Sequence, residues 1–262
     1  MDSLRAIANR HGTDKGTEGP VPTWSAHNYT DLYEAYLCSM RSQPINLLEV
    51  GIGVAGQNTN NKIVRGRNTS GGASLKMWAE YFPFAHVYGI DINPANHLDT
   101  ARISTTVCDQ SQEEALRALV ARLSGVDFDV IIDDGSHRAA DQQLTLGVLF
   151  PKLALGGHYF IEDLGSESGA VTPTRQVLRS FQESGHFGTP NSLADADYLG
   201  AWISWIQFHA PVVKVVVRSG YLRPFRPLIR LLEYRDDTDR LCTIRKRITP
   251  AQPLRSPETV IG

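Results

Sequence analysis

Short apolar runs alternate with segments of helical periodicity along most of the chain. The apolar runs that predict strands span 45–53, 86–93, 101–111, 128–134 and 156–163. The segments with apolar residues at helical spacing span 29–40, 73–82, 112–123 and 141–153. Because strands that alternate with helices form βαβ units, the pattern predicts an α/β fold with a parallel sheet covered by helices on both faces.

The later part of the chain departs from this alternation. Two apolar stretches, 202–210 and 212–219, are separated only by Pro211. So short a connection permits antiparallel pairing but no crossover, so we expect the mostly parallel sheet to end in an antiparallel hairpin.

Three parts are expected along the chain. Residues 1–40 predict a helical N-terminal cap, 41–218 the core, and 219–262 a basic C-terminal extension. Within the core, the polar stretch 56–72 is rich in Gly and Asn and predicts a long mobile loop, which is uncommon in compact domains unless it is functional.

Composition narrows the class of protein. A chain of 262 residues with 42% hydrophobic and 21% charged residues can form one packed domain, and its net charge of -2 gives no general attraction to nucleic acid or anionic membranes. Cys38, Cys108 and Cys242 are too scattered for a disulfide framework or a zinc site. The first residues lack an apolar core of signal-peptide length, and Lys214 interrupts the strongest apolar run. We therefore expect a soluble, cytoplasmic protein.

Candidate ligand-binding residues lie where the first three predicted strands end. In an open α/β sheet, ligands bind beyond the carboxyl ends of the strands. Glycines there let the backbone approach a ligand, an acid after the second strand suits ribose hydroxyls, and polar groups after the third suit an adenine edge. These positions hold Glu49, Gly51, Gly53, Asp91, Asp109 and Gln110. The glycines also match G-x-G-x-x-G formally, so this motif leaves a dinucleotide site open.

Two acidic pairs follow the fourth and fifth predicted strands. They are Asp133 with Asp134 and Glu162 with Asp163. Four carboxylates at one sheet edge would repel one another unless a cation compensates, and oxygen ligands select Mg²⁺ first, with Mn²⁺ or Ca²⁺ as alternatives. We expect Asp134, Glu162 and Asp163 to bind the ion, with Asp133 either nearer the cofactor or behind the residues that bind the ion.

His137 lies three residues after Asp134. A divalent cation lowers the pKa of a coordinated hydroxyl, and a neutral imidazole within hydrogen-bond reach can then accept its proton. His137 is thus the candidate general base. The alternative interpretation is that Ser136 or His137 simply caps the following helix.

The motifs HGTDKGT (11–17), HNYTDLYEAYL (27–37), LLEVGIG, GGASLKMW, YGIDI, IIDDGSH and FIEDL resemble those of one enzyme family. They are similar to the metal-dependent sugar O-methyltransferases of actinobacteria. That group includes macrolide-sugar, aminocoumarin and methylmannose-polysaccharide methyltransferases and cephalosporin hydroxylase-like proteins. The resemblance covers about residues 8–217 and implies a Rossmann-like class I methyltransferase fold that binds S-adenosyl-L-methionine.

The resemblance also implies particular residue roles. It implies Mg²⁺ on the three acids and His137 as base, with Ser74 added to the cofactor contacts. It implies a lid over cofactor and substrate that holds Thr13, Lys15, His27 and Tyr29, for which packing in the cap is the alternative. The acceptor would be a sugar-containing molecule, and members of the group often form homo-oligomers.

Some features leave alternatives open. Trp202 and Trp205 would either stack on a sugar or pack against the sheet. The arginines after residue 218 would either bind an anionic substrate or partner, or form a solvated face. Methylation of a catechol or phenol, or a non-catalytic cofactor-binding role beside a partner enzyme, are the competing functions.

Overall fold

A computed structural model describes residues 1–17, 27–56, 70–164, 171–209, 212–214, 233–235 and 240–249. Most of the predicted loop 56–72 and most of the arginine-rich region after residue 218 lie outside these residues. Among the described residues, no helix is both long and apolar enough to cross a bilayer.

The main sheet has seven strands in the order β3-β2-β1-β4-β5-β9-β6. β1 to β5 are parallel, whereas β9 runs antiparallel to both β5 and β6. The strands are β1 (Asn46–Val50), β2 (His86–Asp91), β3 (Ile103–Val107), β4 (Phe128–Asp133), β5 (Leu153–Ile161), β6 (Ile203–His209) and β9 (Leu241–Lys246). The predicted α/β fold, with a mostly parallel sheet and an antiparallel end, is confirmed.

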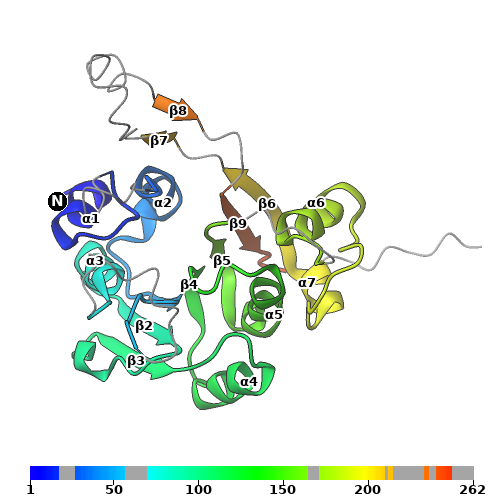
Figure 1. Cartoon of the computed structure of the whole chain (residues 1–262), viewed down its shortest axis with the longest axis horizontal. Coiled ribbons are helices and arrows are strands. Elements are labelled where there is room, and N and C mark those ends of the chain that lie inside the picture. Colours follow the sequence, from blue (N-terminus) through cyan, green and yellow to red (C-terminus); the bar gives the residue numbers. More distant parts are fainter. Residues whose placement is uncertain are drawn as a thin grey trace, which may run out of the picture.

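Helices cover both faces of this sheet. In Figure 1, α1 to α3 (blue to cyan) lie at the left, whereas α4 to α7 (green to yellow) lie below and to the right. The helices are α1 (Leu4–His11), α2 (Thr30–Leu37), α3 (Ala73–Tyr81), α4 (Glu113–Arg122), α5 (Ala139–Leu149), α6 (Thr174–Ser184) and α7 (Ala196–Trp202). Short 3₁₀ turns at Cys38–Met40, Asn96–Leu98 and Phe150–Lys152 connect elements. The four predicted helices are present, whereas α6 and α7 were not expected from the pattern.

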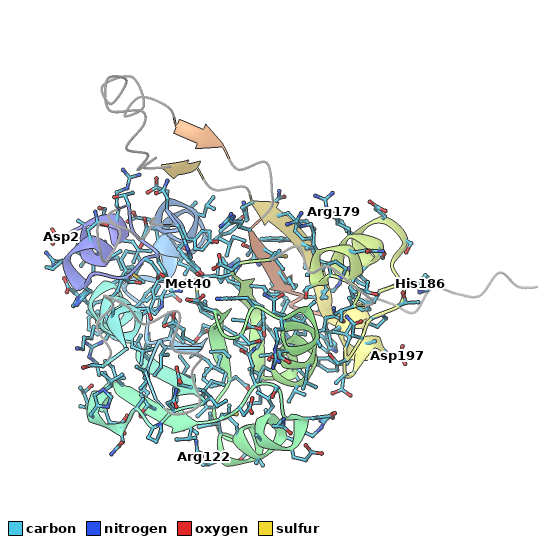
Figure 2. All side chains as sticks on the ribbon, viewed as in Figure 1. Asp2, Met40, Arg122, Arg179, His186 and Asp197 are labelled. Carbon is cyan, nitrogen blue, oxygen red and sulfur yellow. The ribbon has the colours of Figure 1, made fainter. Side chains whose placement is uncertain are left out.

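Two hydrophobic cores follow from the alternation of side chains along the strands. Leu47 of β1 packs with α1, α2 and α3, whereas its neighbour Leu48 packs with α4 to α7 on the opposite face. Charged side chains such as Asp2, Arg122 and Asp197 point outward at the periphery (Figure 2). The sheet is therefore buried on both faces, as parallel sheets usually are.

The predicted pairing of 202–210 with 212–219 is wrong. β6 instead pairs with β9, and β7 (Val212–Lys214) pairs with β8 (Glu233–Arg235) in a separate two-stranded sheet. Four residues of β9, Leu241 to Ile244, are buried, and this burial makes it an inner strand of the main sheet. The segment expected as a basic extension thus supplies a strand between β5 and β6.

Candidate active site

The site lies where β2, β1, β4 and β5 end side by side. Three backbone hydrogen bonds join these ends: Gly51 N to Ile90 O (2.8 Å), Asp134 N to Val50 O (2.9 Å) and Glu162 N to Asp133 O (2.9 Å). Because the strands are parallel and in register, their carboxyl ends meet at one edge. The acidic pairs and the glycine turn, distant in sequence, are therefore neighbours.

Gly51 is required for this close approach. Its φ of 81° lies in the left-handed region, and a Cβ there would stand 2.3 Å from the carbonyl oxygen of Asp134. Gly53 also has a positive φ, of 69°, but a Cβ there would meet no atom of the described residues within 4 Å. The close approach of Asp134 thus requires glycine at position 51, and no such contact among the described residues requires it at position 53.

Asp91 ends β2 and holds the turn that contains these glycines. Its Oδ2 accepts hydrogen bonds from the backbone N–H groups of Ile52 (3.2 Å) and Val54 (3.3 Å), and its Oδ1 accepts one from Asn93 N (2.9 Å). Asn93 Nδ2 donates a fourth, longer hydrogen bond to Oδ1 (3.5 Å), so a ribose hydroxyl would have to displace one of these four donors. Asp91 is thus both a scaffold of the turn and a candidate ribose ligand.

The residues after β3 are occupied differently. The Gln110 amide donates to Asp133 Oδ1 (3.2 Å) and Thr145 Oγ1 (3.1 Å) and accepts from Ser136 N (2.6 Å). Its side chain therefore fixes the turn after β4, a role that sequence reasoning did not predict. Asp109 Oδ1 accepts from the backbone N–H of Ser111 (2.9 Å) and is the less buried of the two predicted adenine contacts.

Three acids at the site are wholly buried, and two of them, Asp133 and Glu49, lie on the side expected to bind the cofactor. Burial raises the pKa of Asp133 to about 7, against opposing hydrogen bonds from Gln110 and Gly135. Burial also raises the pKa of Glu49 to about 7, although Lys15 and Ser74 lower it. Ser74, near the start of α3, is thus placed beside Glu49, as expected if both contact one cofactor.

Asp134 and Asp163 meet beside His137 at the candidate metal centre. One ligand atom from each lies within 4.8 Å of the others. His137 Nε2 is 4.0 Å from Asp134 Oδ1 and 3.8 Å from Asp163 Oδ2. The two acids predicted to bind the ion on either side of His137 are therefore together.

Glu162 points elsewhere in this structure. Its Oε1 accepts hydrogen bonds from Lys15 Nζ (2.7 Å) and from the hydroxyl of Tyr33. Burial and Asp134 raise the pKa of Glu162, while Lys15 and Tyr33 oppose that rise. Its other oxygen, Oε2, is buried and has no hydrogen-bond partner among the described residues. An oxygen-rich set with an unsatisfied buried carboxylate atom fits a hard divalent cation.

The N-terminal segment closes over these acids. Lys15 Nζ donates to Asp134 and Glu162 and lies 3.3 Å from Glu49 Oε1. Tyr29 donates its hydroxyl to Asp163 Oδ1 (2.6 Å), and His27 Nδ1 lies 3.7 Å from the same oxygen. Burial raises the pKa of Asp163, but His27, His137 and the Tyr29 hydrogen bond outweigh this effect and lower it.

Two more residues lie near the site: Thr13, which the sequence predicts there, and Tyr33, which it does not. Thr13 is buried and accepts a hydrogen bond from Lys15 N (3.4 Å), so its described role is within the segment. The helical spacing of 29–40 predicts Tyr33 only as an apolar position of a helix. Its hydroxyl reaches Glu162, and only the packing of α2 against β5 places it there.

Several characterised methyltransferases are similar to this chain, although no family model matches it. It is 41% identical over 162 residues to the 8-demethyl-8-(2-methoxy-alpha-L-rhamnosyl)-tetracenomycin-C 3'-O-methyltransferase of Streptomyces olivaceus, covering 62% of this chain and 36% of that protein. It is 33% identical over 210 residues to the L-olivosyl-oleandolide 3-O-methyltransferase of Streptomyces antibioticus, covering 75% of this chain and 49% of that protein. The chain thus spans about half or less of the length of these relatives.

A solved structure shares the fold. The MycE methyltransferase from the mycinamycin biosynthetic pathway, in complex with Mg, SAH and mycinamycin VI, matches 94% of this chain and 55% of its own. The TM-score is 0.65 at 23% sequence identity. The match supports the Rossmann-like methyltransferase fold. The sequence similarities to the Streptomyces enzymes confirm the expected resemblance to sugar O-methyltransferases over the matched part of the chain.

Proposed function

We propose that this chain transfers a methyl group from S-adenosyl-L-methionine to a hydroxyl of a sugar, with a divalent cation, Mg²⁺ first, as the metal. The observation that carries the proposal is the meeting of Asp134, His137 and Asp163 at the edge of the sheet, beside the Gly51 turn. The homologous proteins act on glycosylated natural products, as their names state. An acceptor of the same class is proposed for this chain.

Asp134, Glu162 and Asp163 are the residues that would hold the cation. When bound, the cation lowers the pKa of an acceptor hydroxyl. Asp134 and Asp163 already converge, and Glu162 lies one residue from Asp163 with an unsatisfied oxygen. Tyr29 and His27 orient the Asp163 carboxylate through Oδ1, the oxygen that does not face His137. Thr13, Lys15, His27 and Tyr29 are proposed as part of a cap over the reacting groups.

His137 is proposed as the general base. Its Nε2 faces the two carboxylates, whereas its Nδ1 is buried and has no hydrogen-bond partner among the described residues. Nε2 is thus the atom that accepts the acceptor's proton. The charges of Asp134 and Asp163 then stabilise the imidazolium that forms.

The cofactor is assigned to the glycine side of the site. Glu49 and Ser74 would face its methionine amine, the Gly51–Gly53 turn would pass beside it, and Asp91 would accept from its ribose. Asp109 and Gln110 would border the adenine, and Asp133 would lie between cofactor and metal. A cytoplasmic location is part of the proposal and is supported by the lack of any disulfide among the three cysteines. We expect neither a nucleic-acid nor a membrane partner, and a homo-oligomer stays a prediction.

The test is a methyl-transfer assay with purified full-length chain, S-adenosyl-L-methionine and matched panels of glycosides and catechols, in Mg²⁺ or in EDTA. Mass spectrometry should show a methylated glycoside only with Mg²⁺. Transfer to catechols alone would replace the sugar acceptor by a phenolic one. Cofactor binding without transfer to either panel would favour the non-catalytic role.

A further inference from the structure

Lys15 is a buried cation among the acids of the site. Its side chain is only 1% exposed. The Nζ atom donates to Asp134 and to Glu162, and it lies 3.3 Å from Glu49 Oε1. Lysine is almost never fully buried unless paired, so these carboxylates are what keeps Lys15 inside the protein.

Hydrogen bonds hold the backbone around Lys15, whereas its side chain is long and can rotate about several bonds. The Lys15 carbonyl accepts hydrogen bonds from Tyr29 N (3.0 Å) and Thr30 N (3.2 Å), which joins the 13–17 segment to the start of α2. A change of partner at Nζ therefore needs rotation about side-chain bonds and no rearrangement of the segment. Glu49 Oε1 is the nearby carboxylate atom that would receive the ammonium.

Lys15 holds two of the three proposed ion ligands. The donor atoms of Asp134, His137 and Asp163 lie within 4.8 Å of one another, but Glu162 is not part of that set because it faces Lys15 and Tyr33. A divalent ion on Asp134 and Glu162 would stand beside an ammonium on the same two carboxylates. Two positive charges held by the same carboxylates repel each other strongly in a site of low dielectric.

We propose that Lys15 is a tethered counter-cation: it neutralises Asp134 and Glu162 while no divalent ion is bound, and moves toward Glu49 when one binds. The inference rests on the proposed ion site. Lys15 is then a positioning residue that lowers the affinity for the ion and keeps the acids together without it. A lysine that merely supports the fold would not compete with the ion.

The experiment measures Mg²⁺ affinity by titration calorimetry on the full chain and its Lys15→Met variant. Removal of the competing charge should lower the Kd for Mg²⁺ about tenfold or more. EDTA should lower the melting temperature of the variant more than that of the wild type, because the acids then lack any cation. Lys15→Arg keeps the positive charge, so its Kd for Mg²⁺ should lie nearer the wild-type value than that of Lys15→Met does.

Lys152→Met is the matched control, because Lys152 pairs with the exposed Asp127 at 3.1 Å on another part of the surface. Its Kd for Mg²⁺ should equal that of the wild type. If Lys15→Met does not fold in EDTA, the Kd for Mg²⁺ is compared between Glu49→Gln and the double variant Lys15→Met/Glu49→Gln. The double variant loses one buried acid together with its partner. Tighter binding in the double variant supports the inference.

Two outcomes overturn the inference and differ in reach. Unchanged or weaker Mg²⁺ binding in Lys15→Met, with normal binding by the wild type, would show a structural lysine and leave the proposed function standing. No Mg²⁺ binding by the wild type or any variant would remove the ion site itself, and the proposed function with it.

Discussion

At the scale of single residues, the site is fixed by unusual backbone conformations. Four described residues other than glycine have a positive φ, and they include His137 (60°) and Asp163 (48°). Asn28, between His27 and Tyr29, has a φ of 57°. Such residues cost about 1–3 kcal/mol each and persist where the surroundings determine them. Their concentration around the candidate metal centre indicates that the backbone places these side chains.

Asp163→Asn should weaken ion binding without a change of backbone. Asparagine adopts the left-handed region as readily as aspartate, so the substitution removes only the charge. We expect the Mg²⁺ affinity to fall by about 10²-fold, since two carboxylates are left, and methyl transfer to fall with it. Calorimetry and the methylation assay measure the two effects.

The control is Asp195→Asn, at an exposed residue with a φ of 51° at the start of α7. It makes the same substitution in the same backbone conformation and should leave Mg²⁺ affinity unchanged. Equal losses in both variants would exclude Asp163 as a ligand.

His137→Ala should reduce methyl transfer by about 10²-fold or more, the usual effect of losing a general base. Binding of S-adenosyl-L-methionine should stay near the wild-type level, because the glycine side of the site is untouched. Calorimetry and product formation separate these readouts. His186→Ala, at an exposed position after α6 (Figure 2), should leave both unchanged. If His137→Ala kept the wild-type turnover, His137 would have no part in the mechanism.

At the scale of elements, the junction between β1 and β4 limits what the first turn accepts. Gly51→Ala places a methyl group 2.3 Å from the Asp134 carbonyl oxygen, in addition to the strain of a positive φ. Gly53→Ala has the strain without any such contact to the residues that the structure describes. We expect Gly53→Ala to lower the free energy of unfolding by about 1–2 kcal/mol, and Gly51→Ala to lower it by more than about 3 kcal/mol.

Urea unfolding of the two variants measures this difference, which isolates the close approach of the strands from backbone strain. Equal destabilisation would mean that the turn relaxes away from Asp134. The contact would then not be needed to bring the glycine turn and the acidic pair together.

At the scale of the whole molecule, His158 couples stability to pH. It lies on β5 among Tyr36, Phe160 and Trp205, and burial, with Arg245 adding, lowers its pKa to about 4. The unfolded chain therefore binds a proton at higher pH than the folded protein does. Stability is present above the usual pKa of about 6.5 and is lost as pH falls toward 4.

His158→Phe should remove this dependence and keep the aromatic packing. Between pH 7 and pH 5, the wild type should lose about 2 kcal/mol of unfolding free energy more than the variant does. Urea denaturation at the two pH values measures the loss. Parallel losses in both proteins would show that His158 is not the group responsible.

The sequence alone predicted the parallel α/β core and the identity of the strand ends. Apolar runs and helical spacing are local signals, so the strands and helices from 29 to 163 were predicted in the right order, although β5 begins at Leu153, the last residue of a predicted helix. The acidic pairs were noticed because each ends a strand, and parallel strands bring such ends to one edge. The motifs also indicated the methyltransferase resemblance that the similar proteins confirm.

Only the tertiary structure decided what depends on partners distant in the chain. β9 carries Arg245 and Lys246 and was read as part of a basic extension, yet its four consecutive buried residues insert it between β5 and β6. Likewise no local pattern shows that Lys15 reaches Asp134 and Glu162, across more than a hundred residues of chain, or that Tyr33 reaches Glu162. Strand pairing and buried charge compensation are non-local: burial of the whole sheet selects them, and periodicity in one segment does not encode them.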